Sequence, residues 1–329
     1  MALTPPVRLQ VDDPSGVAPA RRAAEDLAAG LGFDERRIGE AAIVVTELAT
    51  NLVRHGGGGE ILLRRTPDAD AAIDAIAWDR GRGMNDVSRS LRDGFSTAGG
   101  AGTGLGAVGR LSTSFDVQST ADRGAVLVAR LGADGPPDVD ALVVAMKGEE
   151  VSGDAWGDAR TGSQVTIILA DGLGHGSEAA LAAATAVREL RADEPPEAQL
   201  ERMHAALRPT RGAAAAIARL DLATGALRFA GIGNIAAAIV GAGSSRSLAS
   251  LNGTLGHRVE RIHAYDYEVE PGGLLVLHSD GCRSGWNLAE HPGLMRRDPL
   301  VIASLLLRDY ERGRDDASVV VARREAAAP

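Results

Sequence analysis

A run of glycines between Asp93 and Leu111 constrains the first half of this 329-residue chain more than any other feature. The segment reads DGFSTAGGAGTGLGAVGRL, and apolar spacing resumes at Val108 and Leu111. Glycine adopts positive φ angles easily and lets backbone N–H groups approach a ligand closely. A glycine loop that leads into a helix also directs free N–H groups and the positive end of the helix dipole at an anion. The segment therefore predicts a phosphate-binding loop, with an ordinary surface loop as the alternative.

The type of phosphate loop does not follow from the glycines alone. Residues 104–109 match the pattern GxGxxG, but a dinucleotide site needs a strand directly before the glycines and an acid about 20 residues later. Residues 96–103 are small and polar, which does not indicate a strand. The Gly-Lys-Ser/Thr ending of a P-loop is absent from the sequence. The neighbouring motifs must therefore identify the nucleotide site.

Length and composition restrict the class of protein. A chain of 329 residues is long enough for about two domains, and 45% hydrophobic with 24% charged residues is typical of globular proteins. The net charge of −9 argues against nucleic-acid binding by phosphate neutralisation. The one cysteine, Cys282, excludes an internal disulfide and a multi-cysteine metal site. Because neither a signal core nor a membrane-length apolar run occurs, we expect a cytoplasmic protein without a membrane partner.

Residues 1–132 read as one α/β domain, and we expect a sandwich with a mixed sheet. The second helix of this domain shows apolar residues at three- and four-residue steps, which is typical of an amphipathic helix, and Asp34 is a plausible N-cap. The expected elements are helices over 18–31 and 34–54 and strands over 7–11, 60–66, 71–79, 115–119 and 125–131.

Two polar groups in this domain suggest nucleotide chemistry. Glu47, Asn51 and His55 lie at i, i+4 and i+8 of the second helix and therefore share one face. Such a row can hold a hydrated Mg²⁺ and accept the proton of a nucleophile, although a solvated helix face is the alternative. Asp79 ends a strand and is followed by Gly81 and Gly83, which suits contact with a base; a tight turn is the alternative.

The order of these motifs resembles the N, G1 and G2 boxes of the GHKL (Bergerat-fold) ATPase and kinase superfamily. Within it, the run from Asp93 and the segment SFDVQS after the loop are most similar to the anti-sigma and switch-protein serine kinases of the RsbT and RsbW type. The resemblance implies that the domain binds ATP and Mg²⁺, with Asn51 as the metal ligand, Glu47 as the general base and Asp79 as the adenine contact. It also implies nucleotide-binding roles for the loop glycines Gly81, Gly83, Gly102, Gly104 and Gly106.

Residues 133–139 have the proline and glycine content of a linker, and residues 140–325 read as a second domain. Its acids, Asp154, Asp171, Asp280 and Asp315, stand where strands meet loops. If they converge, two carboxylates about 5 Å apart repel by roughly 3 kcal/mol at an effective dielectric constant near 20. Cations would relieve this repulsion, and an all-oxygen set selects Mg²⁺ or Mn²⁺. The alternative is that each Asp-Gly pair marks a β-turn.

The second half resembles the PP2C-like serine/threonine phosphatases of the SpoIIE and RsbX branch, through Gly-Asp, Ala-Asp-Gly-x-Gly-His-Gly, Gly-Asn, Ser-Asp-Gly and Asp-Asp-x-Ser. The resemblance implies an αββα sandwich with a two-metal site. Asp171 would bridge the metals and Gly172 would offer its carbonyl; Asp280 and Asp315 would hold one metal and Asp154 the other. The arginine that binds phosphate in the eukaryotic family has no clear match, and Arg160 and Lys147 are candidates.

Together the two resemblances predict a bifunctional regulator of bacterial stress or sigma-factor partner switching. Its first domain would phosphorylate a partner protein with Mg-ATP, and its second domain would remove phosphate with Mn²⁺ or Mg²⁺. The expected partners are a STAS-domain antagonist or a stressosome protein, with a sigma factor as a further candidate. Two alternatives remain open. The first domain could sense ATP or bind an anti-sigma partner without transferring phosphate, and the whole chain could be a metal-free scaffold.

Overall fold

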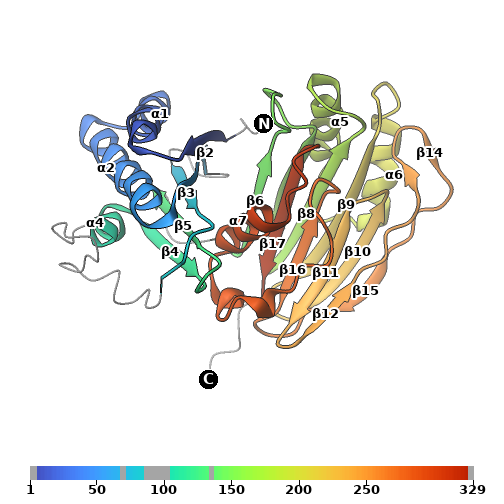
Figure 1. The fold of residues 1–329 in the computed structure, drawn as a ribbon. Helices are drawn as coiled ribbons and strands as arrows, with labels where there is room; N and C mark the ends of the chain where they lie inside the picture. Colours follow the sequence, from blue (N-terminus) through green and yellow to red (C-terminus); the bar gives the residue numbers. More distant parts are fainter. Residues whose placement is uncertain (1–5, 67–71, 85–103, 133–136, 325–329) are drawn as a thin grey trace. The chain divides into compact units, whose positions relative to one another are not determined.

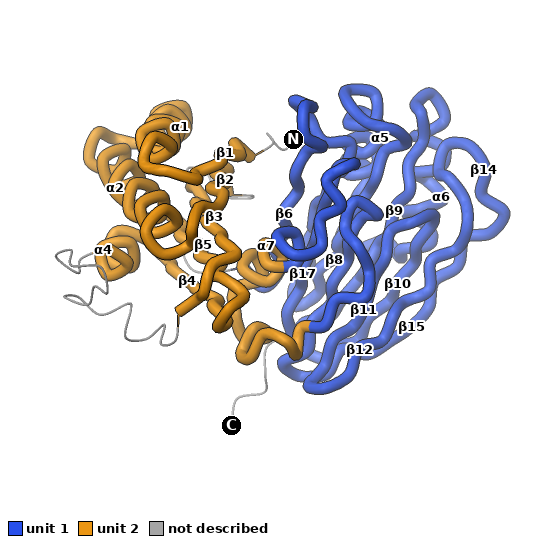
Figure 2. The backbone as a smooth tube through the Cα atoms, in the orientation of Figure 1, with its two compact units in different colours: residues 1–5, 137–287, 306–329 blue, residues 6–136, 288–305 orange. Residues whose placement is uncertain are grey.

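A computed structural model describes residues 6–66, 72–84, 104–132 and 137–324. The chain forms two compact units, shown in Figure 2: unit 2 contains residues 6–136 and 288–305, and unit 1 contains chiefly residues 137–287 and 306–329. Across the described residues, no helix is long and apolar enough to cross a membrane. The glycine segment up to residue 103 and most of the linker lie outside the described residues.

Unit 2 is a five-stranded sheet in the order β1-β2-β3-β5-β4, with helices packed on one face (Figure 1). The predicted α/β sandwich is confirmed, but the mixed sheet is wrong, because every pairing between its strands is antiparallel. β4 and β5 are joined by a tight turn, a connection that only antiparallel neighbours allow. The elements are β1 (Val7–Val11), α1 (Val17–Gly30), α2 (Glu35–Asn51), β2 (Gly59–Arg65), β3 (Ile73–Trp78), α4 (Gly104–Leu111), β4 (Ser114–Ser119) and β5 (Ala125–Leu131).

Helix α2 carries the polar row of the expected nucleotide site and packs against the core of unit 2. Asp34 caps it, because the Asp34 carboxylate accepts a hydrogen bond from the Arg37 N–H at 2.8 Å. Its α-helical part ends at Asn51, earlier than predicted, and a wide π-helical turn follows over Leu52–Gly56. Gly57 then ends the turn with φ +71°, a conformation that glycine reaches without strain.

A buried ion triplet crosses three neighbouring strands of this sheet. Arg64 on β2 and Arg130 on β5 both stand directly opposite Asp74 on β3. The Asp74 carboxylate accepts from Arg64 Nη2 at 2.8 Å and from Arg130 Nε at 2.6 Å, and the Asp74 side chain is fully buried. Burial acts to raise the pKa of Asp74, but the two guanidinium groups outweigh it and hold that pKa below its ordinary value.

A segment from late in the sequence also belongs to unit 2. Residues 288–305 meet β4 and its turn, where the Asp116 carboxylate accepts from Arg297 Nη1 at 3.0 Å and from the Asp298 N–H at 2.7 Å. The Thr120 hydroxyl lies 3.1 Å from His291 Nδ1. Unit 2 is therefore completed by residues that sequence alone assigns to the second domain.

Unit 1 contains two five-stranded antiparallel sheets, one ordered β15-β10-β9-β8-β7 and the other β12-β11-β16-β17-β6. An apolar core that includes Leu169, Phe229 and Leu277 joins their facing sides, and α5 with α6 covers the other face of the first sheet. The two sheets and this helical layer follow the predicted αββα arrangement.

The strands of the first sheet are β7 (Asp154–Thr161), β8 (Gln164–Gly172), β9 (Ala213–Asp221), β10 (Ala226–Ile232) and β15 (Tyr265–Glu268). The strands of the second are β6 (Val139–Val144), β11 (Ala236–Gly241), β12 (Ser244–Ser247), β16 (Leu274–His278) and β17 (Ala317–Arg323). The remaining elements of unit 1 are α5 (Ser177–Arg188), α6 (Pro196–Ala206) and the short pair β13 (Gly253–Thr254) and β14 (Arg258–Val259). Helix α7 (Pro299–Tyr310) begins in the segment that belongs to unit 2 and ends in unit 1.

Asp74→Asn is expected to destabilise unit 2 by about 3–5 kcal/mol, because two buried guanidinium groups lose their shared carboxylate. Hydrogen exchange of the β2, β3 and β5 amides under native conditions measures this loss. Glu40→Gln is the matched control, since the Arg36–Glu40 pair is an exposed i,i+4 pair worth about 0.3–0.5 kcal/mol. Equal, small effects of both substitutions would contradict a structural role for the triplet.

Candidate active sites

The four acids predicted to bind metal stand at the ends of strands in unit 1. Asp154 opens β7 and is the direct cross-strand partner of Asp171, which lies near the end of β8. Asp280 follows β16, and Asp315 precedes β17, its antiparallel neighbour. Cross-strand partners have Cβ atoms about 5 Å apart, so Asp154 and Asp171 are close neighbours.

The side chain of Asn234 lies between Asp171, on the first sheet, and Asp280, which follows a strand of the second sheet. Asn234 Nδ2 donates to Asp280 Oδ2 at 2.7 Å and lies 3.4 Å from Asp171 Oδ2. Asn234 belongs to the Gly-Asn turn before β11, where Gly233 has φ +95° and a Cβ on it would lie 2.5 Å from the Ala214 side chain. The strain and crowding require glycine at position 233, which explains the Gly-Asn pair of the sequence.

Asp154 is held by two hydroxyl groups that the sequence analysis did not assign. Ser279 Oγ and Ser318 Oγ donate to Asp154 Oδ2 at 2.6 and 2.8 Å. Burial raises the pKa of Asp154 to about 7 despite these two bonds. Ser279 directly precedes Asp280, and Ser318 is the serine of Asp-Asp-x-Ser. Both serines therefore belong to motifs that the sequence analysis used only for their acids.

The carboxylates also repel one another. Burial, followed by the charges of Asp154, Asp280 and Asp315, raises the pKa of Asp171 to about 8. The pKa of Asp315 is raised as well, by burial and then by Asp280 and Asp316. A divalent cation is the species that such a set of acids lacks, because it would favour their charged forms.

The choice between Asp315 and Asp316 has a geometric basis. The Asp316 carboxylate accepts from the Met146 N–H at 2.8 Å and from the Gly153 N–H at 2.7 Å, and its side chain is buried. It therefore ties the loop before β7 to the start of β17. The Asp315 side chain is exposed and faces the same pocket as Asp280, which favours Asp315 as the metal ligand.

Gly172 meets the backbone of helix α5 at close range. A Cβ at this position would collide with the carbonyl oxygen of Ala179, so only glycine fits. In the part of the chain that the structure describes, no group of three or more His, Cys, Asp or Glu side chains is placed to hold a metal ion. Asn234 and the two serines are instead the immediate partners of the acids, while the all-oxygen donor set and the repulsion around Asp171 fit a hard divalent ion.

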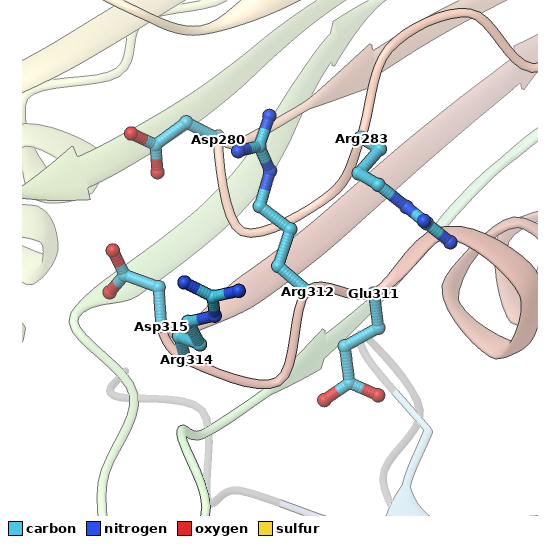
Figure 3. A pocket seen from close by; sticks show the side chains of 6 residues that line it. All are labelled: Asp280, Arg283, Glu311, Arg312, Arg314 and Asp315. Carbon is cyan, nitrogen blue, oxygen red and sulfur yellow. The ribbon is translucent and has the colours of Figure 1, made fainter.

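A pocket of ≈ 450 Å³ adjoins this acid cluster. Figure 3 shows its lining, in which Asp280 and Asp315 are joined by residues of the turn after β16 and of the loop before β17. The six lining residues are Asp280, Arg283, Glu311, Arg312, Arg314 and Asp315.

In unit 2, the structure brings the predicted base close to the start of α4. Glu47 and Asn51 lie one turn apart on α2, and both are half-buried. A Cβ on Gly104, the first residue of α4, would lie 3.1 Å from Glu47 Oε2. Gly104 and the buried Gly106 form the first turn of α4, where N–H groups have no partner within the helix. Gly102 lies outside the described residues.

The loop after β3 is shaped by glycines that approach other backbone atoms. The Asp79 carboxylate is almost fully buried and accepts from the Gly81 N–H at 2.8 Å. A Cβ on Gly81 would lie 2.7 Å from the Gly56 carbonyl oxygen, and one on Gly83 would collide with the Thr120 carbonyl. Asp79 is therefore fixed by a loop that no larger residue could form.

His55 does not continue the α-helical row of Glu47 and Asn51, because the α-helix ends at Asn51. It lies in the π-helical turn, and burial together with the charges of Arg82 and Arg54 lowers its pKa although Asp79 opposes the shift. The shift favours the neutral imidazole. Arg80 and Arg82 flank Gly81, and Arg82 acts electrostatically on His55.

Two family models match the chain. Residues 161–325 match Stage II sporulation protein E (SpoIIE), and residues 11–131 match the histidine kinase-like ATPase domain. The serine/threonine-protein kinase RsbT of Bacillus subtilis (strain 168) is 36% identical over 117 residues, which are 34% of this chain and 86% of that kinase.

Solved structures resemble more than half of the chain. One of them is reported from work on the bacterial stressosome, a modular system adapted to control secondary messenger signalling. It is 31% identical to this chain with a TM-score of 0.52, and the match covers 56% of this chain and 98% of that structure's chain. RsbX in complex with magnesium has 21% identity and a TM-score of 0.49, with 56% and 94% covered. The chain therefore belongs to the SpoIIE family of PP2C-like phosphatases through its second half, and its first half is a histidine kinase-like ATPase domain of the RsbT kinase type.

Proposed function

We propose that this chain is a bifunctional regulator of stress or sigma-factor partner switching, in which unit 1 removes phosphate from a serine or threonine of a partner protein and unit 2 adds it. The cluster of mutually repelling carboxylates around Asp171 carries the phosphatase assignment. The partner would be a STAS-domain antagonist or a stressosome protein, because the relatives are RsbT and a stressosome-related structure. A sigma factor is a further candidate partner, and we place the reaction in the cytoplasm.

In the phosphatase site, Asp154, Asp171, Asp280 and Asp315 would hold two divalent ions, with the carbonyl of Gly172 as an additional ligand. Bound there, Mg²⁺ or Mn²⁺ supplies charge stabilisation for phosphoryl oxygens and lowers the pKa of a water. Ser279 and Ser318 orient Asp154, and the Asn234 amide sets the spacing between Asp171 and Asp280. The chain's own contribution is to hold the acids in one geometry.

In the kinase site, Glu47 would accept the proton of the attacking serine or threonine hydroxyl, since it lies on α2 opposite the first turn of α4. Asn51 would ligate the Mg²⁺ that accompanies ATP, and Asp79 would hold the adenine. Gly81 and Gly83 would shape the loop over the nucleotide, and Gly102, Gly104 and Gly106 would direct N–H groups at its phosphates.

Mn²⁺ is expected to raise the Tm of unit 1, and the rise should be larger at pH 8 than at pH 6. Because the pKa of Asp171 is raised, its protonated form stabilises the fold at low pH, and this stability is lost as the pH rises through about 8. Protons compete with metal at pH 6, whereas at pH 8 the metal replaces the missing charge compensation. A free Mn²⁺ concentration of 100 times Kd would stabilise the folded unit against unfolding by about 2.7 kcal/mol. Differential scanning calorimetry with and without Mn²⁺ measures the rise; its absence at both pH values would support the metal-free scaffold.

Asp171→Asn is expected to lower Mn²⁺-dependent hydrolysis of a phosphoserine peptide by more than about 100-fold. The loss of a hydrogen-bond partner behind a metal ligand already costs about 10- to 100-fold, and the loss of a ligand itself should cost more. The same substitution should reduce the Mn²⁺-induced rise in Tm. Asp193→Asn changes an exposed aspartate outside the site and serves as the control. Activity that survives Asp171→Asn unchanged would rule out the assigned site.

Glu47→Gln is expected to reduce phosphate transfer by about 10²- to 10⁴-fold without loss of ATP binding, because a general base is needed for transfer and not for binding. The experiment uses an Asp171→Asn background, so that product is not removed. Intact mass of a STAS-domain partner reports the transfer, and calorimetric titration reports ATP binding. If Glu47→Gln leaves the rate of partner phosphorylation unchanged, Glu47 is not the base. If neither the parent nor the substituted protein transfers phosphate while both bind ATP, unit 2 is an ATP sensor.

A further inference from the structure

The pocket beside the acid cluster is lined by arginine side chains as well as by acids. Asp280 and Asp315 belong to the proposed metal ligands, and the rest of the lining is three arginines and Glu311. Arg283 donates from Nη2 to the Asp309 carbonyl oxygen at 3.0 Å and lies over the Tyr310 ring. No ion pair in the described part of the chain involves Arg312 or Arg314. These two guanidinium groups are exposed donors without an acidic partner.

The walls of this pocket are fixed by backbone hydrogen bonds. The Arg312 N–H donates to the Gly281 carbonyl at 2.8 Å, and the Arg283 N–H donates to the Tyr310 carbonyl at 2.9 Å. A Cβ on Gly281 would collide with the Asp316 carbonyl, so the two chain segments touch directly. In Figure 3, Arg312 extends from the loop before β17 toward the turn that carries Asp280, while Arg314 neighbours Asp315. The arginines therefore stand on a rigid frame at the edge of the proposed metal site.

The pocket is also larger than a phosphoryl group. Five heavy atoms of about water size need on the order of 150 Å³ at ~30 Å³ each. The pocket volume is ≈ 450 Å³, so a phosphoryl group at Asp280 and Asp315 leaves room for a second group next to it. Arginine binds carboxylates with paired N–H donors, and an anion is the complement of this lining. In a protein of net charge −9, the guanidinium groups of Arg312 and Arg314 also offset repulsion of an acidic substrate.

We propose that Arg312 and Arg314, beside Arg283, bind an acidic residue that flanks the phosphorylated serine or threonine of the substrate; this inference rests on the proposed phosphatase function. Arg160, a candidate from the sequence, does not fit this role. It pairs with Asp158 at 3.0 Å and lies near the far end of β7, six residues from Asp154, which corresponds to about 20 Å of strand.

The test compares three substrates with the Mn²⁺-loaded full chain: p-nitrophenyl phosphate, a phosphoserine peptide flanked by glutamates, and the same peptide flanked by alanines. Wild-type protein should prefer the glutamate peptide by about tenfold in kcat/KM, and added salt should weaken this preference. Arg312→Gln combined with Arg314→Gln should bring the ratio close to one. Lysine at both positions should restore part of it, and Arg160→Gln should keep the wild-type ratio.

Binding of the glutamate peptide without phosphate, followed by fluorescence anisotropy, provides a readout that needs no turnover. The double glutamine variant should bind it about tenfold more weakly than wild type. An unchanged ratio and unchanged binding would overturn the proposal. An equal loss on all three substrates would also overturn it, because the arginines would then serve the phosphoryl group or the fold. If wild-type protein hydrolyses no substrate, the phosphatase assignment fails, while the anisotropy still decides whether the pocket binds acidic peptide.

Discussion

Repulsion among clustered carboxylates is the interaction on which unit 1 depends. Asp154, Asp171, Asp280 and Asp315 come from strand ends that are far apart in the sequence, and the two sheets bring them together. Burial, and then the charges of neighbouring aspartates, raise the pKa values of Asp154, Asp171 and Asp315. The neighbouring polar groups are arranged around that repulsion: two hydroxyls bind Asp154, and an amide lies between Asp171 and Asp280.

Close backbone approach is the corresponding constraint in unit 2. Asp79 is buried because Gly56 and Gly81 allow the end of α2 and the loop after β3 to touch. The same principle operates in unit 1, where Gly172 meets α5 and Gly281 meets Asp316. Glycines in both halves thus act by steric exclusion of any Cβ, and this is why they stand next to the acids that the proposed chemistry uses.

The two units also differ in how charge is stabilised. In unit 2, Asp74 lies between Arg64 and Arg130, so a buried carboxylate is compensated within the protein. In the described part of unit 1, Asp154, Asp171 and Asp315 form no ion pair with an arginine or lysine, and their pKa values are raised. A compensated acid is typical of a structural role, whereas an uncompensated acid cluster at a surface pocket is typical of a site that binds a cation.

The sequence alone determined the order and type of most elements and the two family resemblances. Apolar periodicity is local, so it predicts α1, β1 and β5 close to their actual bounds. The motifs are equally local, and the comparisons confirm both resemblances. Tertiary structure decided what depends on distant residues. Asn234 reaches Asp280 only through sheet pairing, and Ser279 and Ser318 meet Asp154 across 125 and 164 positions. Residues 288–305 join unit 2 through Asp116, and the arginine pocket forms where two loops cross. Such contacts follow from packing in three dimensions, which local sequence patterns do not encode.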